Sequence, residues 1–273
     1  MHIYLNASEI AGLINKNKYN SQEDVIYDIL CRIKKETNKS DINKLEIINK
    51  SELLDLLKLF NESSLLDSNI CNKFKETIKT TPSDKLSSIS KDILDNAAKQ
   101  SVNTKNTEES RQIQNNIETN IKKVMKTKNI ENVKSYVDGH INKTRGIVNE
   151  NKIISSYEKK NNTKICDNNS KLYKMKLFTI NDYKIYICGK IDGIEDNKLI
   201  EIKNRRNRLF EFIPLYEQIQ IEVYFRLTNL KEGKLIQNYN DTTSEFPICC
   251  NDELWATIQK DLIEACKIII SRL

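Results

Sequence analysis

The stretch Gly189-Lys-Ile-Asp-Gly-Ile194, followed by Leu199-Ile-Glu-Ile-Lys203, decides the fold that this sequence predicts. In the second part, apolar and charged residues alternate, which is typical of a β-strand whose side chains point to opposite faces in turn. Glu201 and Lys203 therefore share one face of the strand, and the isoleucines between them face the core. The pattern predicts a sheet with charged residues at one defined position.

A short hairpin turn at Glu195-Asp196-Asn197 brings Asp192 beside Glu201 and Lys203. Two carboxylates and an amine then converge, a grouping that suits phosphodiester hydrolysis with Mg²⁺ or, in its place, Mn²⁺. In such a site the lysine can orient or deprotonate the attacking water, or neutralise developing negative charge. Taken alone, the same spacing also fits a surface hairpin with an ion pair.

The flanking segments predict an α+β protein. Strands are expected at residues 172–180, 184–194 and 198–203, and helices at 145–159, 214–227 and 252–273. Residues 1–35 are interpreted as two N-terminal helices that belong to the core. The polar, Asn/Lys/Ser-rich residues 36–135 are interpreted as a helical insertion or subdomain, and residues 136–273 as the catalytic core.

The amino-acid composition limits the classes of partner, metal site and compartment expected for this chain. The 273 residues carry 44 Lys+Arg against 38 Asp+Glu, a net charge of +6 that weakly favours a polyanionic partner. The seven cysteines include no CxxC pair, so neither a zinc ribbon nor a disulfide framework is expected, and the compartment is interpreted as intracellular and reducing. Cys249, Cys250 and Cys266 lack the usual spacing for an iron–sulfur cluster. No signal peptide or membrane-spanning segment is expected.

Several motifs occur in an order that resembles one family. They are Ala7-Ser8-Glu9, Gly146 with Glu150, Asp192-Gly193, Glu201-x-Lys203 and Tyr216-Glu-Gln218-Ile-Gln220. The chain is similar in this respect to PD-(D/E)XK nucleases of the phage lambda exonuclease and YqaJ-like viral recombinase family, over roughly residues 1–30 and 140–273. The resemblance implies a restriction-endonuclease-like core, a small mixed sheet flanked by helices, with a helical N-terminal half.

The resemblance also implies residue roles. Glu150, Asp192, Glu201 and the backbone carbonyl of Ile202 would hold the metal, Lys203 would be the catalytic lysine, and Gln218 the catalytic helical glutamine, with Gln220 its neighbour on the DNA side. Ser8 would lie near the 5′-phosphate, unless it is only a helix cap, and Arg145 would meet a phosphate. Where the family has Cys-Pro after the lysine, this chain has Asn204-Arg205-Arg206, and Arg205, Arg206 and Arg208 are candidate phosphate donors.

The function expected from these residues is a 5′–3′ exonuclease acting on linear duplex ends in viral-type recombination or repair. A single-strand annealing protein and a homo-oligomer are the expected protein partners. Two alternatives stay open: a structure-specific endonuclease of the same superfamily, and a non-catalytic DNA-binding or scaffold protein in which the helical N-terminal half does the work.

Overall fold

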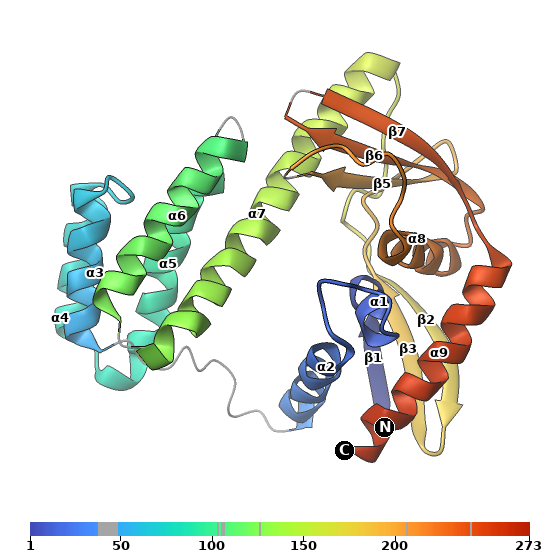
Figure 1. The fold of residues 1–273 in the computed structure, drawn as a ribbon, viewed down its shortest axis with the longest axis horizontal. Helices are drawn as coiled ribbons and strands as arrows, with labels where there is room; N and C mark the ends of the chain where they lie inside the picture. The colour runs from blue at the N-terminus through green and yellow to red at the C-terminus, as the bar shows by residue number, and fades with distance from the viewer. Residues whose placement is uncertain (38–48, 103, 105–106, 126, 206, 241) are drawn as a thin grey trace. The chain divides into compact units, whose positions relative to one another are not determined.

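The computed structural model describes residues 1–37, 49–102, 104, 107–125, 127–205, 207–240 and 242–273 (Figure 1). The chain divides into two compact units. One consists of Met1–Ser40 together with Lys152–Leu273, and the other of Asp41–Asn151. The predicted insertion spans residues 36–135, whereas the second unit continues into the long helix α7 (Thr127–Asn161), which crosses from one unit to the other.

The first unit contains a three-stranded sheet in the order β1-β3-β2. Its strands are β1 (His2–Asn6), β2 (Tyr173–Ile180) and β3 (Tyr183–Gly189), with β1 parallel and β2 antiparallel to β3. Strand β1 corrects the prediction that residues 1–35 are helical throughout. Ile3 and Leu5 alternate with polar residues and are fully buried, but five residues of this pattern are too few to outweigh a helix signal without the distant partner strand.

A four-stranded sheet of order β4-β5-β6-β7 carries the predicted motif. It consists of β4 (Gly193–Glu195), β5 (Lys198–Asn204), β6 (Glu232–Tyr239) and β7 (Thr242–Cys249). The β4–β5 hairpin turns at Asp196 and Asn197, which both have positive φ, as predicted for this turn. β5 and β6 pair in parallel, and helix α8 (Leu215–Thr228) makes the crossover between them.

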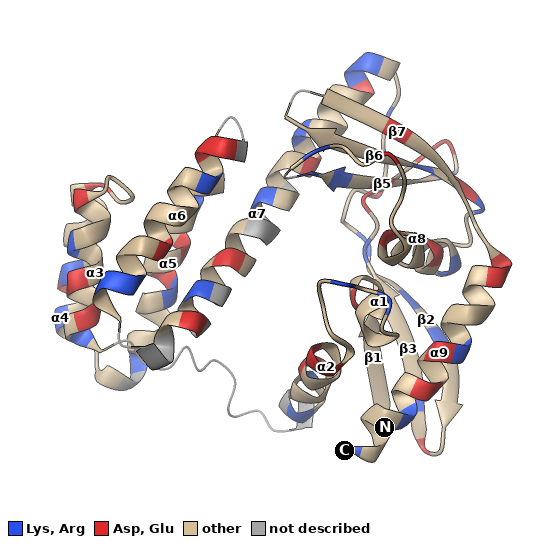
Figure 2. Ribbon diagram, in the orientation of Figure 1, with Lys and Arg blue, Asp and Glu red and all other residues tan. Residues whose placement is uncertain are grey.

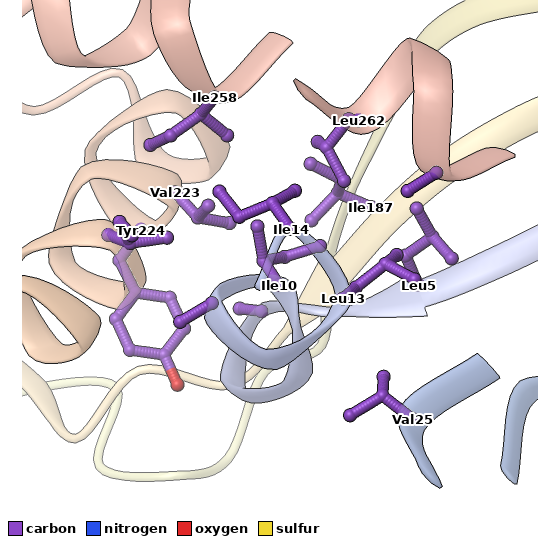
Figure 3. Packing of buried hydrophobic residues seen from close by; sticks show 14 of the residues in the cluster. Leu5, Ile10, Leu13, Ile14, Val25, Ile187, Val223, Tyr224, Ile258 and Leu262 are labelled. Atoms are coloured by element: carbon purple, nitrogen blue, oxygen red, sulfur yellow. The ribbon is translucent and has the colours of Figure 1, made fainter. Parts of the chain in front are cut away.

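Helices cover one face of the first sheet. They are η1 (Ala7–Glu9), α1 (Ile10–Leu13), α2 (Gln22–Thr37), α8 and α9 (Asp252–Ser271). Figure 3 shows Leu5 and Ile187 of the sheet packing with α1, α8 and α9 through residues such as Leu13, Val223 and Leu262. This apolar core fixes α8 against the sheets, so the side chains of α8 face strand β5 in a defined register.

The second unit is helical. It contains α3 (Lys50–Glu62), α4 (Ser68–Thr80), η2 (Ser83–Lys85), α5 (Leu86–Val102), α6 (Thr107–Val124) and most of α7. These helices share their own core, which includes Leu56, Phe60, Leu94, Ile117 and Val137. Acidic and basic residues are interspersed along the ribbon of α3 to α6 (Figure 2).

The α+β class with small mixed sheets flanked by helices is confirmed. The predicted single sheet is two sheets, and β6 and β7 were not predicted. β7 contains Pro247, which an edge strand tolerates because one side of it needs no ladder hydrogen bonds. Across the described parts of the chain, no helix is both long enough and apolar enough to cross a bilayer.

Candidate active site

Strand β5 places Glu201 and Lys203 on one face, as the alternation predicts. Ile200 and Ile202 point to the opposite face, where they join a small apolar cluster with Ile154, at the C-terminal end of α7. Glu201 is almost fully buried, at 1% exposure, whereas the Lys203 side chain keeps 22% of its surface exposed. The site therefore opens to solvent on the lysine side.

Asp192 lies in the segment that joins β3 to β4 and is itself 8% exposed. Its Oδ2 accepts a hydrogen bond of 2.7 Å from the backbone N–H of Ile202, which ties the carboxylate to the middle of β5. Gly193, the next residue, pairs with Ile200 across the hairpin, and a Cβ there would collide with the Ile165 side chain. Packing against Ile165 thus requires a glycine at position 193.

A chain of polar contacts joins β5 to α8. The Lys203 ammonium lies 2.7 Å from Glu201 Oε1 and donates to Gln220 Oε1 at 3.0 Å. Gln220 in turn donates from Nε2 to the Tyr224 hydroxyl at 2.9 Å. The other Glu201 oxygen, Oε2, is buried and has no hydrogen-bond partner among the described residues. An orphaned buried carboxylate oxygen is costly unless a further cation or water meets it.

Burial and neighbouring charges set the protonation of this pair. Burial, and after it the negative charge of Asp192, raises the pKa of Glu201 to about 8, while Lys203 opposes the rise. Burial alone lowers the pKa of Lys203, but the charges of Glu201 and Asp192 outweigh it and raise that pKa above its ordinary value. Lys203 is therefore held as a cation, one positive charge beside two carboxyl groups.

The residues present fit a hard divalent cation. Asp192 and Glu201 supply carboxylate oxygens, Glu201 Oε2 is without a partner, and Mg²⁺ is typically held by one or two carboxylates with water completing its shell. Within the described parts of the chain, no group of three or more His, Cys, Asp or Glu side chains forms a metal site. The fit thus rests on two carboxylates and the orphaned oxygen.

The structure separates the two predicted glutamines. Gln220 contacts the lysine, whereas Gln218 is exposed and donates to the backbone carbonyl of Ile213 at 2.6 Å. Gln218 lines a cavity of about 410 Å³ that neither carboxylate of the candidate site borders. The physical reason is helix geometry: residues two apart point about 200° from one another around the axis, so only one of the pair can face β5.

Arg205 is also placed differently from the prediction. Its guanidinium is buried, donates to both carboxylate oxygens of Glu217 at 2.5 and 2.9 Å, and donates through Nε to Gln237 at 2.9 Å. The Phe210 ring lies 4.0 Å from the guanidinium carbon. Because these partners occupy its donors, Arg205 fixes the loop after β5 onto α8 and does not point to solvent as a phosphate donor would.

Five predicted residues remain: Ser8, Arg208, Arg206, Arg145 and Glu150. Ser8 is exposed in η1, where Asn6 and Glu9 form the capping box, and Arg208 is exposed in the loop after β5. Arg206 lies outside the described residues. Arg145 belongs to the second unit, where it is buried and donates to Thr104 Oγ1 at 3.2 Å. Glu150 belongs to the second unit as well.

Sequence reasoning missed Glu217, Gln237 and Tyr224 as partners of the site. Glu217 and Tyr224 lie at buried positions of α8 and Gln237 at a buried position of β6, and a polar residue at a core-facing position is a signal of a buried network. The partner could not be identified from that signal, because Glu217 and Arg205 are joined across a loop and Gln237 lies on a strand that was not predicted.

Comparison with known proteins gives distant structural similarity only. No family model matches the chain, and no curated protein matches it in sequence.

Among solved structures, SSO0001 is similar at a TM-score of 0.34 and 16% identity, covering 89% of this chain and 86% of that one. An alkaline exonuclease (LHK-Exo) from Laribacter hongkongensis is similar at 0.36 and 14%, covering 57% of this chain and 87% of that one. Its complex with dAMP is similar at 0.36 and 14%, covering 64% and 86%. At these values the similarity carries no functional inference.

Proposed function

We propose that this chain is a divalent-metal-dependent deoxyribonuclease of the PD-(D/E)XK class. One observation carries the proposal: Asp192, Glu201 and Lys203 converge on β5, with a buried carboxylate oxygen that lacks a partner. A buried carboxyl pair beside a single ammonium is costly in a structural role, because burial of charge must be compensated. A bound cation would supply that compensation.

In this proposal Asp192 and Glu201 hold Mg²⁺, or Mn²⁺ in its place, together with the backbone carbonyl of Ile202. When bound, the metal would supply positive charge to neutralise the phosphate and would make a nearby water more acidic. Glu150 would complete the ligand set, as the family resemblance implies. Lys203, held 2.7 Å from Glu201, would orient the attacking water or neutralise charge on the phosphate.

Gln220 acts as a positioning residue in this scheme. Its amide oxygen accepts from Lys203 and its amide nitrogen donates to Tyr224, so the lysine is held between Glu201 and α8. A lysine has four rotatable side-chain bonds, and fixing its ammonium in advance reduces the entropy lost at the transition state. The catalytic glutamine expected at position 218 is therefore proposed to be Gln220.

The finer assignment follows the family resemblance. We propose 5′–3′ exonuclease activity on linear duplex ends, in viral-type recombination or repair in an intracellular, reducing compartment. Ser8 would lie at the 5′-phosphate and the exposed Arg208 on the backbone. The resemblance further suggests a single-strand annealing partner and a homo-oligomer.

End-labelled linear duplex DNA tests the proposal directly. Degradation is expected with Mg²⁺ or Mn²⁺ and not with EDTA, and Glu201→Gln should slow it roughly 100-fold or more. Glu253→Gln, the same change at an exposed position of α9, should leave the rate unchanged. Rapid cleavage of closed circular DNA would instead identify an endonuclease. DNA binding with no metal-dependent cleavage would identify a non-catalytic binding or scaffold protein.

A further inference from the structure

The face of the β1-β3-β2 sheet that points away from the core is rich in tyrosine and lysine. Strand alternation and the pairing register put nine residues on it: His2, Tyr4, Asn6, Lys174, Lys176, Thr179, Lys184, Tyr186 and Cys188. We call these nine residues the tyrosine–lysine face. The opposite face of the same strands holds the buried Ile3, Leu5, Ile185 and Ile187.

Two tyrosines form the centre of this face. Tyr4 and Tyr186 are paired across β1 and β3, and their rings stack with centroids 5.4 Å apart and planes inclined by 28°. The Lys174 ammonium lies 4.1 Å from the Tyr4 ring centroid and 4.4 Å from that of Tyr186, and donates to the Tyr4 hydroxyl at 2.9 Å. The His2 ring lies 5.3 Å from the Tyr186 ring.

The charge on this face has one sign. Lys174, Lys176 and Lys184 are exposed, and none of the nine residues is acidic. The Glu9 carboxylate borders this face, because the Asn6 side chain donates to it at 3.2 Å, but it is paired with Arg32. The chain as a whole has almost as many acidic as basic residues, so nine residues with three lysines and no acid are a local feature. Such a surface is complementary to a polyanion, because each lysine that meets a phosphate releases a condensed counterion.

The combination of aromatic rings with lysines indicates which class of polyanion this face would bind. A surface that binds only phosphates needs no aromatic rings, whereas single-stranded nucleic acids present unpaired bases that stack on tyrosine. Tyr4 and Tyr186 are half-buried. In duplex DNA the bases are already stacked on each other and offer only their edges. The ammonium of Lys174 lies over both rings, a place that a base can take while the lysine moves to a phosphate.

We propose that the tyrosine–lysine face binds single-stranded DNA, with bases on Tyr4 and Tyr186 and phosphates on the three lysines. This inference depends on the proposed function in one respect only: the choice of DNA rather than RNA as the ligand follows from the proposed deoxyribonuclease activity. It adds a binding surface for an unpaired strand to an enzyme proposed to act on duplex ends, and none of its nine residues belongs to the candidate active site.

Fluorescence anisotropy of a labelled oligo(dT) of about 12 nucleotides tests the proposal, with the full chain in EDTA. EDTA separates the two hypotheses, because strand binding here requires neither metal nor cleavage. We expect Tyr186→Ala to weaken binding roughly tenfold and Tyr186→Phe to keep it, since stacking on one ring contributes about 1–3 kcal/mol. Lys174→Ala should lower the slope of log Kd against log salt by about 0.7.

Matched controls lie on helices of the same unit. Tyr27→Ala on α2 removes a tyrosine that is 67% exposed, and Lys260→Ala removes an exposed lysine of α9. Both should bind oligo(dT) as the wild type does. Unchanged binding by Tyr186→Ala and Lys174→Ala, or equal losses in the controls, would overturn the proposal. Tighter binding of duplex DNA or of oligo(U) than of oligo(dT) would overturn the assignment to single-stranded DNA.

Discussion

Replacing Arg205 with methionine is expected to destabilise the first unit severely. The substitution keeps an apolar stem but removes the guanidinium that donates to both carboxylate oxygens of Glu217, and both side chains are less than 10% exposed. Breaking a buried ion pair on one side costs about 3–5 kcal/mol, because the remaining charge has neither partner nor water. Loss of the contact with Phe210 adds about 0.5–2 kcal/mol.

The expected total, about 3.5–7 kcal/mol, is a large share of the ~5–15 kcal/mol that stabilises a typical domain. Urea unfolding at pH 7, followed by tryptophan fluorescence, measures it. The chain has a single tryptophan, Trp255, which lies in α9 of the first unit, so the signal reports on that unit. The second unit can unfold separately without confusing the result.

The double variant Arg205→Met with Glu217→Leu is the matched control. It removes both charges, and replacing a buried ion pair by apolar residues is often neutral or stabilising. We therefore expect the double variant to recover most of the stability that Arg205→Met loses. A loss below about 1 kcal/mol in the single variant, or a double variant as unstable as the single one, would refute the reasoning.

Three further predictions concern the site. The pKa of Glu201 is raised to about 8, mainly by burial, so the folded state retains a proton that the unfolded state loses above about pH 4.5. Wild-type stability should fall as pH rises from about 4.5 to 8, and Glu201→Gln should flatten this dependence in urea titrations without metal; parallel curves would contradict it. Gln220→Ala should slow metal-dependent DNA cleavage roughly 10- to 100-fold, whereas Gln218→Ala should change the rate less than twofold. Equal effects of the two substitutions would contradict the assignment of the positioning role to Gln220. Gly193→Ala should lower the stability of the first unit by about 1–3 kcal/mol, because the new methyl group collides with Ile165, and an unchanged unfolding midpoint would show that the hairpin can shift.

The local part of the fold could be predicted from sequence, because it depends on short-range patterns. The alternation in Leu199–Lys203 requires a strand, Asp196 and Asn197 favour a tight turn, and α8 follows a proline at its N-cap. The cluster of Asp192, Glu201 and Lys203 was predictable for the same reason, since it lies on one hairpin and its approach.

The rest depends on contacts between distant segments. Strand β1 exists because it pairs with β3 about 180 residues later, and the pattern in its five residues is too short to indicate this. The choice between Gln218 and Gln220 depends on the rotation of α8 about its axis, which the core contacts of Val223 and its neighbours fix. Arg205 was predicted to be an exposed phosphate donor, because nothing nearby in the sequence indicates that its guanidinium pairs with the carboxylate of Glu217.

The positive φ angles at Asp196 and Asn197 in the hairpin turn recur at other non-glycine residues of this chain. Among the described residues, ten non-glycine positions have positive φ, seven of them asparagine, and no glycine does. Glycine would adopt these left-handed conformations with less strain, but it would also leave the unfolded chain freer and increase the entropy lost on folding. The chain therefore has slightly strained backbone conformations at its turns, and its unfolded state has fewer accessible conformations than it would have with glycine at these positions.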